Sequence, residues 1–272
     1  MAGAAALVAQ DQQPRSQPGW PCVGSPDPSY FRVAEATGGQ VFLFDKSEIG
    51  SSAILAIAAN RYEETVFRAA GSLVDGRHEF SFPIDSAVDE VMVSVSLQCL
   101  QSADIVTPSG QLLQNTGAGE FHAFRAGRIV TLPQPERGAW RVRVAGRGMF
   151  FLVVQARSEL SLDRVEFVRE GGRPGHEGLF PTHEPPRAAV PQSLAIAVSG
   201  IIGDVRARLV TSAFEEVKTL PLRESSSDAI GHEFVARVTP PATPFRLVVS
   251  GVDAMGLPFQ RVHAPLFEPT RR

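Results

Sequence analysis

The chain has 272 residues, of which 43% are hydrophobic and 20% charged, a composition typical of folded globular proteins. The net charge of −3, with acidic and basic residues interspersed, argues against nucleic acid as a partner. No apolar run reaches the roughly 18 residues that a membrane-spanning helix needs, so we predict no membrane span.

Residues 1–25 begin with a short apolar stretch, Ala4 to Ala9, followed by polar sequence rich in Gln and Pro. Small residues near Ala9 resemble the end of a secretory signal, although a basic start is absent and the apolar part is short. We therefore expect a signal-peptide remnant or, alternatively, a disordered tail. On balance the protein is predicted to be secreted.

Residues 26–61 contain signals for a helix, a strand and a second helix. Asp27 suits the N-cap of a helix with Pro28 at its first position, and Gly38-Gly39 is a stop signal. The sequence VFLF at 41–44 predicts a buried strand, and residues 47–60 predict another helix.

Residues 62–158 change to a period of two, which indicates strands. We expect about eight short strands separated by turns, among them a hairpin whose turn is Pro108-Ser109-Gly110. One of these strands, RVRVA at residues 141–145, is expected to end at the glycines that follow it. Such a series is typical of a β-sandwich, with Trp140 packed between its sheets.

The remaining chain has a Pro- and Gly-rich segment and then a second series of strands. Residues 159–192 are predicted to be a linker with a crossing strand. Residues 193–268 have the strand density of an immunoglobulin- or fibronectin-like sandwich, with a hairpin turn between Asp253 and Gly256. The predicted fold class is mainly β, with two antiparallel sandwiches and a short N-terminal α/β remnant.

The two cysteines, Cys22 and Cys99, leave two interpretations open. In a cytosolic chain they would be unrelated buried thiols. In a secreted chain they would form a disulfide that joins the entry segment to the first sheet.

Residues 31–59, FRVAEATGGQVFLFDKSEIGSSAILAIAA, resemble the C-terminal tail of a von Willebrand factor A domain. The following SFPIDSAVDEVMVSVS, VTPSGQLL and PERGAWRVRVAG resemble the β-sandwich region of hemicentin and von Willebrand factor A domain-containing protein 7-like proteins, and its first sandwich resembles galactose-binding-like jelly rolls. The D-x-S-x-S metal loop of A domains is absent, so the resemblance implies no metal site. We predict that the remnant lacks parallel strand neighbours, packs on the first sandwich and is secured by Cys22–Cys99.

No catalytic constellation is evident in the sequence. Adjacent acids such as Glu63-Glu64 point to opposite faces of a strand, and no G-x-S-x-G motif is present. His176 and His183 lie in a Pro-rich loop without H-E-x-x-H spacing. We predict no enzyme activity, no metal and no cofactor.

Three residues are candidates for ligand binding. Arg141 and Arg143 alternate with valines and suit carboxylate or sulfate recognition, or else simply face water. Trp20 suits stacking on a sugar if exposed. We expect a secreted adhesion, matrix or surface-binding module whose partner is an extracellular protein or glycan. The alternatives are a hydrolase or hydrolase accessory domain, and the C-terminal fragment of a longer A-domain protein.

Overall fold

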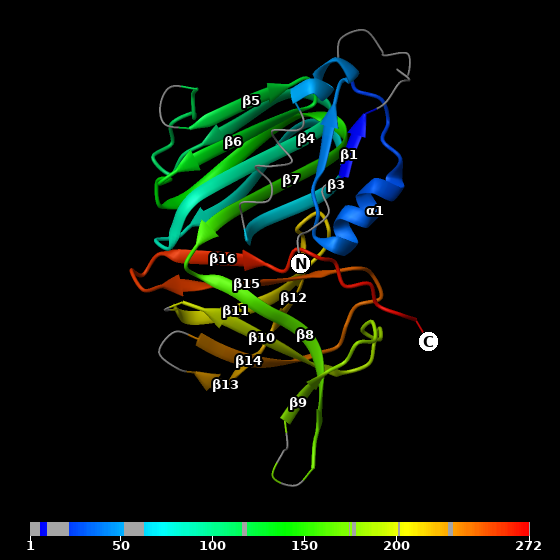
Figure 1. The fold of residues 1–272 in the computed structure, drawn as a ribbon, viewed down its shortest axis with the longest axis vertical. Coiled ribbons are helices and arrows are strands. Elements are labelled where there is room, and N and C mark those ends of the chain that lie inside the picture. Colours follow the sequence, from blue (N-terminus) through cyan, green and yellow to red (C-terminus); the bar gives the residue numbers. More distant parts are fainter. Residues whose placement is uncertain are drawn as a thin grey trace.

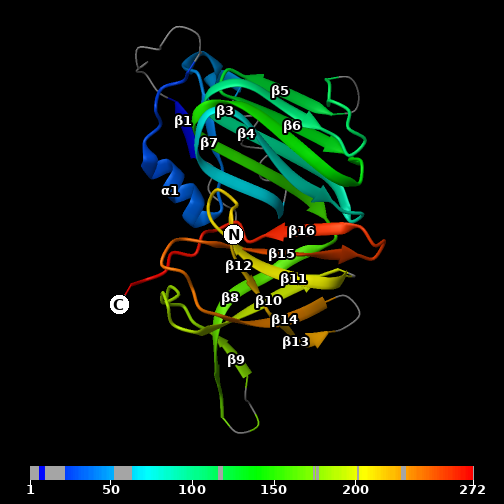
Figure 2. The same ribbon diagram turned by 180° about the vertical axis from the view of Figure 1, so that it is seen from behind.

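The computed structural model describes residues 6–9, 22–51, 63–115, 119–173, 175, 178–200, 202–227 and 231–271. These residues form two β-sandwiches, one above the other in Figure 1, with a small α/β unit beside the first. Figure 2 shows the same arrangement from behind, with α1 and β1 again flanking the first sandwich. The predicted mainly β fold class is confirmed.

The first sandwich is built from long strands that fold back on themselves. Phe67 and Phe82 lie in one strand and would be about 50 Å apart if it were straight. Their ring centroids are 5.9 Å apart, so the strand must bend and contribute to both layers. The strand order is β3-β7-β4-β6-β5, with bounds Glu64–Ile84 (β3), Gly138–Ser158 (β7), Val88–Val106 (β4), Gly127–Pro133 (β6) and Glu120–Phe124 (β5).

Bulges and glycines make these bends possible. The register shifts between Leu73 and Gly76 in β3 and between Leu97 and Cys99 in β4. At Gly146 of β7 the backbone has φ 144°, and a Cβ atom would lie 2.3 Å from the Cys99 carbonyl oxygen. The expectation of short strands ended by a glycine turn is therefore wrong, because these glycines bend a continuous strand.

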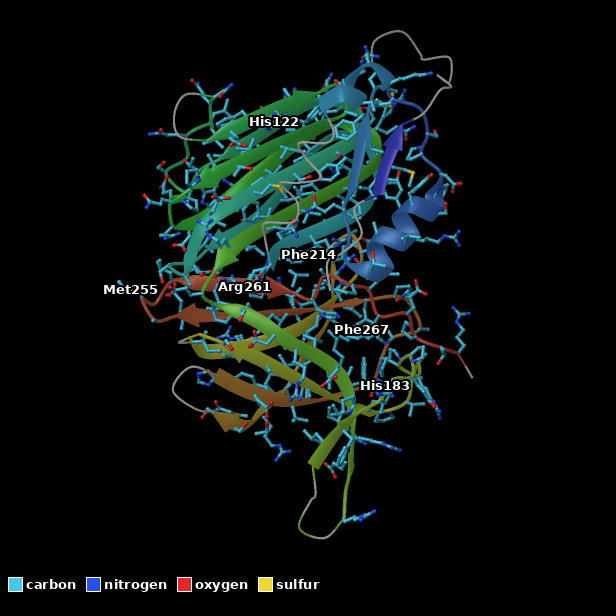
Figure 3. All side chains as sticks on the ribbon, viewed as in Figure 1. His122, His183, Phe214, Met255, Arg261 and Phe267 are labelled. Atoms are coloured by element: carbon cyan, nitrogen blue, oxygen red, sulfur yellow. A yellow bond between two sulfur atoms is a disulfide. The ribbon has the colours of Figure 1, made fainter. Side chains whose placement is uncertain are left out.

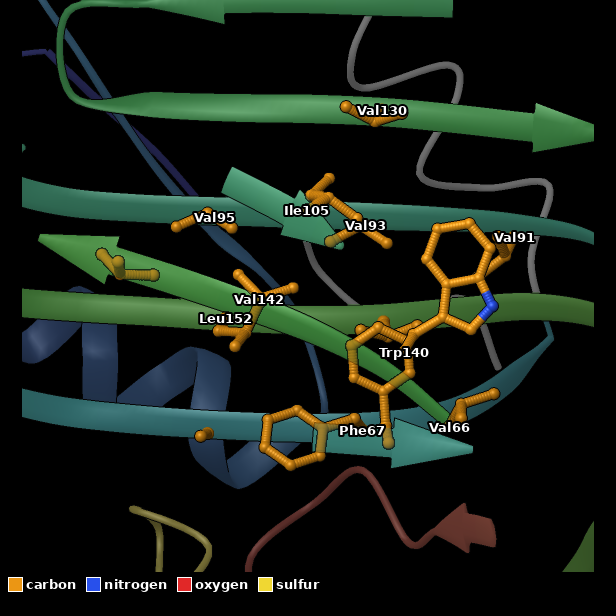
Figure 4. Packing of buried hydrophobic residues seen from close by; sticks show 14 of the residues in the cluster. Val66, Phe67, Val91, Val93, Val95, Ile105, Val130, Trp140, Val142 and Leu152 are labelled. Carbon is orange, nitrogen blue, oxygen red and sulfur yellow. The ribbon is translucent and has the colours of Figure 1, made fainter. Parts of the chain in front are cut away.

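The core lies between the two layers. Figure 4 shows Trp140, Val142 and Ile105 from one layer packed against residues of the other, including Val95 and Leu152. The Trp140 side chain is buried as predicted, and its indole nitrogen donates to the Glu136 carbonyl oxygen at 2.7 Å. The predicted hairpin turn is also present, since Val106 bridges to Leu112.

The N-terminal unit consists of β1 (Ala6–Ala9), α1 (Pro28–Thr37), β2 (Val41–Phe44) and a 3₁₀ turn, η1 (Lys46–Ser51). The Asp27 carboxylate accepts from the Ser29 amide and Gly38 ends the helix in the left-handed conformation, both as predicted. The expectation that β2 lacks a parallel neighbour is wrong, because β1 pairs with it in parallel. This pairing supplies partners for backbone groups within the segment predicted to be a tail.

The predicted helix over 47–60 is not observed where the structure describes it. Residues Lys46–Ser51 form the 3₁₀ turn, and residues 52–60 lie outside the described part of the chain. The Asp45 carboxylate accepts from the Ser47 amide at 3.0 Å, and the Glu48 carboxylate accepts from the Asp45 amide at 2.8 Å. These local hydrogen bonds favour a tight turn at this point.

The N-terminal unit covers the outer face of one layer of the first sandwich, as predicted. Phe31 and Leu43 pack with Phe151 and Val153 of β7, and Phe44 packs with Phe124 of β5. Because this layer is covered on both faces, the second side-chain set of β4 is also buried, namely Met92, Ser94 and Ser96. The Cys22–Cys99 disulfide fastens the unit at the bend of β4, confirming the predicted pairing.

The second sandwich has two sheets, as predicted. One has the order β13-β14-β10-β8-β9, with bounds Leu222–Ser227 (β13), Gly231–Val238 (β14), Gln192–Ser199 (β10), Ser161–Gly171 (β8) and Gly178–Pro181 (β9). The other has the order β12-β11-β15-β16, with bounds Glu216–Leu220 (β12), Ile202–Val210 (β11), Arg246–Asp253 (β15) and Pro258–Val262 (β16).

Residues 159–192, expected to be a linker with a crossing strand, contribute β8 and β9 to this sandwich. β8 pairs with β10 along most of its length, and its Phe167 belongs to the core. Alternation of apolar and polar residues in LSLDRVEFV already fits a half-buried strand. The second sandwich therefore begins earlier than residue 193. The hairpin turn between Asp253 and Gly256 is confirmed.

Candidate functional site

A glutamate and two arginines form a buried ionic cluster where the N-terminal unit and the two sandwiches meet. Glu35 of α1 pairs with Arg68 of β3 at 3.2 Å and with Arg246 of β15 at 2.6 Å. The two arginine side chains have almost no solvent exposure, and the Ser212 hydroxyl also donates to the Glu35 carboxylate. One carboxylate thus joins all three parts of the molecule.

Arg68 also holds the end of α1. Its guanidinium donates to the carbonyl oxygens of Ala34, Gly38 and Gly39, at a helix end where carbonyls lack intrahelical partners. Its guanidinium carbon lies 4.8 Å from the centroid of the Phe151 ring, a cation–π distance. The helix is therefore attached to the sandwich by polar as well as apolar contacts.

The ionic cluster keeps its charges at neutral pH. Burial, and then the charge of Arg246, lower the pKa of Arg68 to about 10. Burial alone would raise the pKa of Glu35, but Arg246 and Arg68 outweigh it, so that pKa lies below its ordinary value. His263, which stacks on Phe267, is neutral, because burial and then Arg246 lower its pKa to about 4.

A second ion pair joins the two sandwiches directly. Arg261 of β16 binds Asp85, which follows β3, through two contacts of 2.7 and 3.2 Å, and both side chains are fully buried. Arg261 also donates to the Leu160 carbonyl at 2.9 Å and the Ser158 hydroxyl at 2.6 Å, where the chain passes between sandwiches. Figure 3 shows Arg261 at this junction.

Two further carboxylates lie nearby in different environments. Burial raises the pKa of Glu64, which accepts from the Leu162 amide at 3.1 Å and lies 3.8 Å from Arg261. Burial also acts on Asp253, but its pKa is lowered because hydrogen bonds from Ser86 and from the backbone of the β15–β16 turn outweigh burial. The Asp253 oxygens accept from both the amide and the hydroxyl of Ser86, at 2.7 and 2.6 Å.

The cluster of Glu35, Arg68 and Arg246 and the Arg261–Asp85 pair are interior contacts that do not line the clefts of the second sandwich. Buried charges need partners, and each of them has one across a boundary between parts of the fold. The arrangement holds the two sandwiches and the N-terminal unit in one orientation. Apolar contact adds to it, since the Phe67 and Phe214 rings from the two sandwiches lie 4.3 Å apart.

Two clefts border the second sandwich. The cleft between the sandwiches has a volume of about 480 Å³ and is lined in part by Leu160 and Asp253, the latter committed to its turn. The other, of about 320 Å³, is polar, and its ionisable side chains are hydrogen-bonded, with Asp163 accepting from the hydroxyls of Ser161 and Ser199. Glu233 binds Arg164 at 2.7 Å and the imidazole of His232 lies 2.8 Å from the Glu224 carboxylate.

A third cleft lies at the open edge of the first sandwich. This edge cleft has a volume of about 230 Å³ and lies between the end of β4, the segment from Leu112 to Asn115, and the strands β5 and β6. Its wall combines apolar residues such as Phe121 with Asp104, His122 and Arg128. It is thus a small pocket with both apolar and polar walls.

The predicted ligand-binding residues are not brought together. Arg143 pairs with Glu79 at 2.7 Å on an exposed sheet face, and Arg141 lies half-buried on the same face. Neither lines the clefts described above. Trp20 lies outside the described residues, as does His176, and His183 lies in an exposed loop (Figure 3).

Sequence reasoning missed the buried ion pairs. A signal was present for Arg68 and Arg246, because each is flanked by apolar residues, in TVFRAA and PFRLVV, whereas Arg261 in PFQRV follows a glutamine. Alternation does not show which charged positions are covered by another domain. No group of three His, Cys, Asp or Glu side chains is arranged to hold a metal ion in the part of the chain that is described. The described helices are too short or too polar to cross a membrane.

Comparisons with known proteins agree with this architecture in part. Residues 65–159 match the sequence model of the family described as hemicentin galactose-binding domain-like. Over 244 residues the chain is 24% identical to mouse hemicentin-1, covering 88% of this chain and about 4% of the length of that relative. The lipase BlEst2 of Bacillus licheniformis, in its propeptide form, aligns with a TM-score of 0.32 and 14% identity over 77% of this chain and 44% of that one, a likeness too weak to establish a common fold. The first sandwich is therefore a hemicentin-like, galactose-binding-like β-sandwich.

Proposed function

We propose that the chain is an extracellular, non-enzymatic module that binds a protein or glycan surface. The observation that carries this proposal is the Cys22–Cys99 disulfide, which fastens the N-terminal unit to a hemicentin-like sandwich. Disulfides persist in oxidising compartments, and both of the chain's cysteines are used in this one. The relation to mouse hemicentin-1 supports the same location.

The internal architecture supports a binding platform. The ion pairs of Glu35 with Arg68 and Arg246, and of Arg261 with Asp85, cross the boundaries between parts and lie out of solvent. Breaking such pairs is costly, so the parts keep one orientation and present a fixed outer surface. A fixed surface reduces the entropy lost on binding a partner.

The absence of enzyme activity is part of the proposal. Catalytic groups are usually titratable residues with shifted pKa values inside a cleft. Here three buried residues with shifted pKa values, Glu35, Arg68 and Arg246, are bound to one another at an internal junction. Two others are also engaged inside the fold, since Glu64 accepts from the Leu162 amide and His263 stacks on Phe267. Asp253 borders a cleft, but its oxygens are occupied by hydrogen bonds within a turn.

We further infer that the N-terminal unit is a remnant similar to the end of a von Willebrand factor A domain. Its order of strand, helix and parallel strand supports this reading. In this chain the unit serves as a cover for the first sandwich, since its apolar residues pack on β5, β6 and β7.

The test uses the chain secreted from eukaryotic cells. Biolayer interferometry against purified matrix proteins and an array of immobilised glycans should show saturable binding to at least one defined component. Binding to neither panel would contradict the proposal. Labelling of the native chain by a fluorophosphonate, absent after heat denaturation, would instead support the hydrolase alternative and contradict the non-enzymatic assignment.

A further inference from the structure

The segment after β16 fastens the second sandwich to α1. This segment, residues 264–270, forms a strap that runs below α1 in Figure 1. Its Leu266 amide donates to the backbone carbonyl oxygen of Glu35 in α1 at 2.7 Å. The side chain of Ala264 lies against the helix end, because a Cβ atom added to Gly38 would be only 2.9 Å from it. The strap therefore closes over the end of the helix.

Isolated hydrogen bonds outside the sheets hold the strap to the second sandwich. The Phe267 amide donates to the Phe245 carbonyl at 2.8 Å, and the Phe245 amide donates back at 3.1 Å. The Thr270 amide donates to the Pro186 carbonyl at 2.8 Å. The ladder between β15 and β16 ends at Val262, before the strap begins. The strap can therefore leave without breaking this ladder.

An imidazole lies where the strap begins. The His263 ring stacks on the Phe267 ring, with centroids 4.9 Å apart and an angle of 17° between the two planes. Phe267 in turn packs on Phe245 and Phe167 of the second sandwich. The imidazole makes no hydrogen bond with any residue that the structure describes. A charged imidazole has two N–H donors, so this environment suits only the neutral ring.

The ionic cluster also opposes a charge on His263. Arg246 acts on the ring, and its guanidinium donates to the Ala264 carbonyl oxygen of the strap at 2.8 Å. The Glu35 carboxylate is already shared by Arg246 and Arg68. Burial, and then the charge of Arg246, therefore lower the pKa of His263 to about 4.

The charged groups on the other neighbouring elements have partners of their own or face water. Glu166 of β8 lies on the outer face of its sheet, 3.4 Å from Arg164. Glu184 pairs with Arg187 at 2.9 Å, and Glu268 of the strap is exposed. None of these carboxylates pairs with the imidazole in the described part of the chain, so a proton on the ring would have no counter-charge.

We propose that the strap is an acid-sensitive latch, in which protonation of His263 releases residues 264–270 from α1 and from the second sandwich. With the strap closed, the charged ring would lie near the Arg246 guanidinium without a hydrogen-bond acceptor. With the strap open, water solvates the ring. Acid therefore favours the open form, which uncovers Phe245 and frees the end of α1. This inference does not depend on the proposed binding function.

The size of the effect follows from the pKa of His263 in the two forms. In the open form the ring regains its ordinary pKa of 6.5, whereas in the closed form the pKa is about 4. Between pH 7.5 and pH 5 the equilibrium should therefore shift toward the open strap by up to about 30-fold. Above pH 7.5 the ring is neutral in both forms, so this equilibrium should no longer change with pH.

Native-state amide hydrogen exchange, followed by NMR at pH 5 and pH 7.5, measures the opening in the unmodified chain. The amides of Leu266, Phe267 and Thr270 donate within the closed strap, so their protection factors should be up to about 30-fold lower at pH 5. The amide of Val249, fully buried inside β15, should stay far more protected than these at both pH values. Strap protection factors that do not change with pH would overturn the proposal. Values equal to that of Val249 at pH 5 would also overturn it, because the opening would then be global unfolding.

A pair of matched variants assigns the response to His263. His263→Phe keeps a ring against Phe267 but cannot bind a proton, so the strap should stay closed and its protection factors should be the same at both pH values. His122→Phe, the same substitution in β5 of the first sandwich, should keep the full response of the unmodified chain. A response that persists in His263→Phe, or that is lost in His122→Phe, would overturn the proposal.

Discussion

The ionic cluster around Glu35 gives a quantitative prediction. Glu35→Gln keeps the shape of the side chain but removes the charge that neutralises Arg68 and Arg246. The two guanidinium groups would then face each other without a counter-charge, at almost no solvent exposure. Breaking a buried pair by removing one partner costs about 3–5 kcal/mol.

This cost corresponds to a measurable change in melting temperature. With an unfolding entropy of about 2.1 cal/mol/K per residue, 272 residues give about 0.57 kcal/mol/K. A loss of about 4 kcal/mol therefore lowers the melting temperature by about 7 °C. Limited proteolysis should also cut near α1 sooner, because Arg68 holds the end of that helix.

Glu79→Gln is the matched control. It breaks the pair with Arg143, in which both side chains are about half exposed. Exposed pairs contribute about 0–1 kcal/mol, so the melting temperature should fall by less than about 2 °C. Scanning calorimetry and urea unfolding compare the two variants. Equal, small losses in Glu35→Gln and Glu79→Gln would refute the claim that the internal cluster holds the parts together.

Three further predictions concern the junction and the bends. The free energy of unfolding should fall as the pH drops from about 6.5 to 4, because His263 binds a proton in the unfolded chain over this range but not in the folded one. The loss is up to about 3 kcal/mol, reduced by the partial exposure of the ring. Glu35, whose pKa is lowered, adds a further loss of stability below pH 4.5, its ordinary pKa, because the unfolded chain then binds a proton more readily. In urea unfolding, His263→Phe should remove the pH dependence of stability between pH 6.5 and 4 only. Asp85→Asn should cost about 3–5 kcal/mol, because it removes the charge that Arg261 contacts through two hydrogen bonds and leaves only Glu64, at 3.8 Å. Glu64→Gln should cost less than about 1 kcal/mol, since burial already disfavours the charge of Glu64; equal effects of the two variants in urea unfolding would contradict this. Gly146→Ala should lower the yield of folded protein severely, because its Cβ atom would meet the Cys99 carbonyl, whereas Gly178→Ala, with open space around it, should express normally.

Local signals in the sequence were sufficient for the elements they control directly. Asp27 and Gly38 mark the ends of α1 because capping depends on neighbouring backbone groups. Trp140 and the Asp253–Gly256 turn were predictable for similar reasons. Cys22 and Cys99, the only two cysteines in the chain, allowed a pairing to be proposed once secretion was assumed.

Contacts between distant segments account for the rest. Gly146 was read as a turn because a glycine that bends a strand and one that ends it look alike in sequence. Met92, Ser94 and Ser96 are covered by a unit about 50 residues earlier, which alternation within one strand cannot show. The edge cleft was missed because its lining comes from β4, the segment after it, β5 and β6, which share no motif in the sequence.

Scanning calorimetry of the intact, oxidised chain tests the central claim most directly, namely that the two sandwiches and the N-terminal unit form one body. The account predicts a single transition whose calorimetric and van't Hoff enthalpies agree, shifted as a whole by Asp85→Asn. Two separate transitions in the unmodified chain, one of them unaffected by Asp85→Asn, would contradict it.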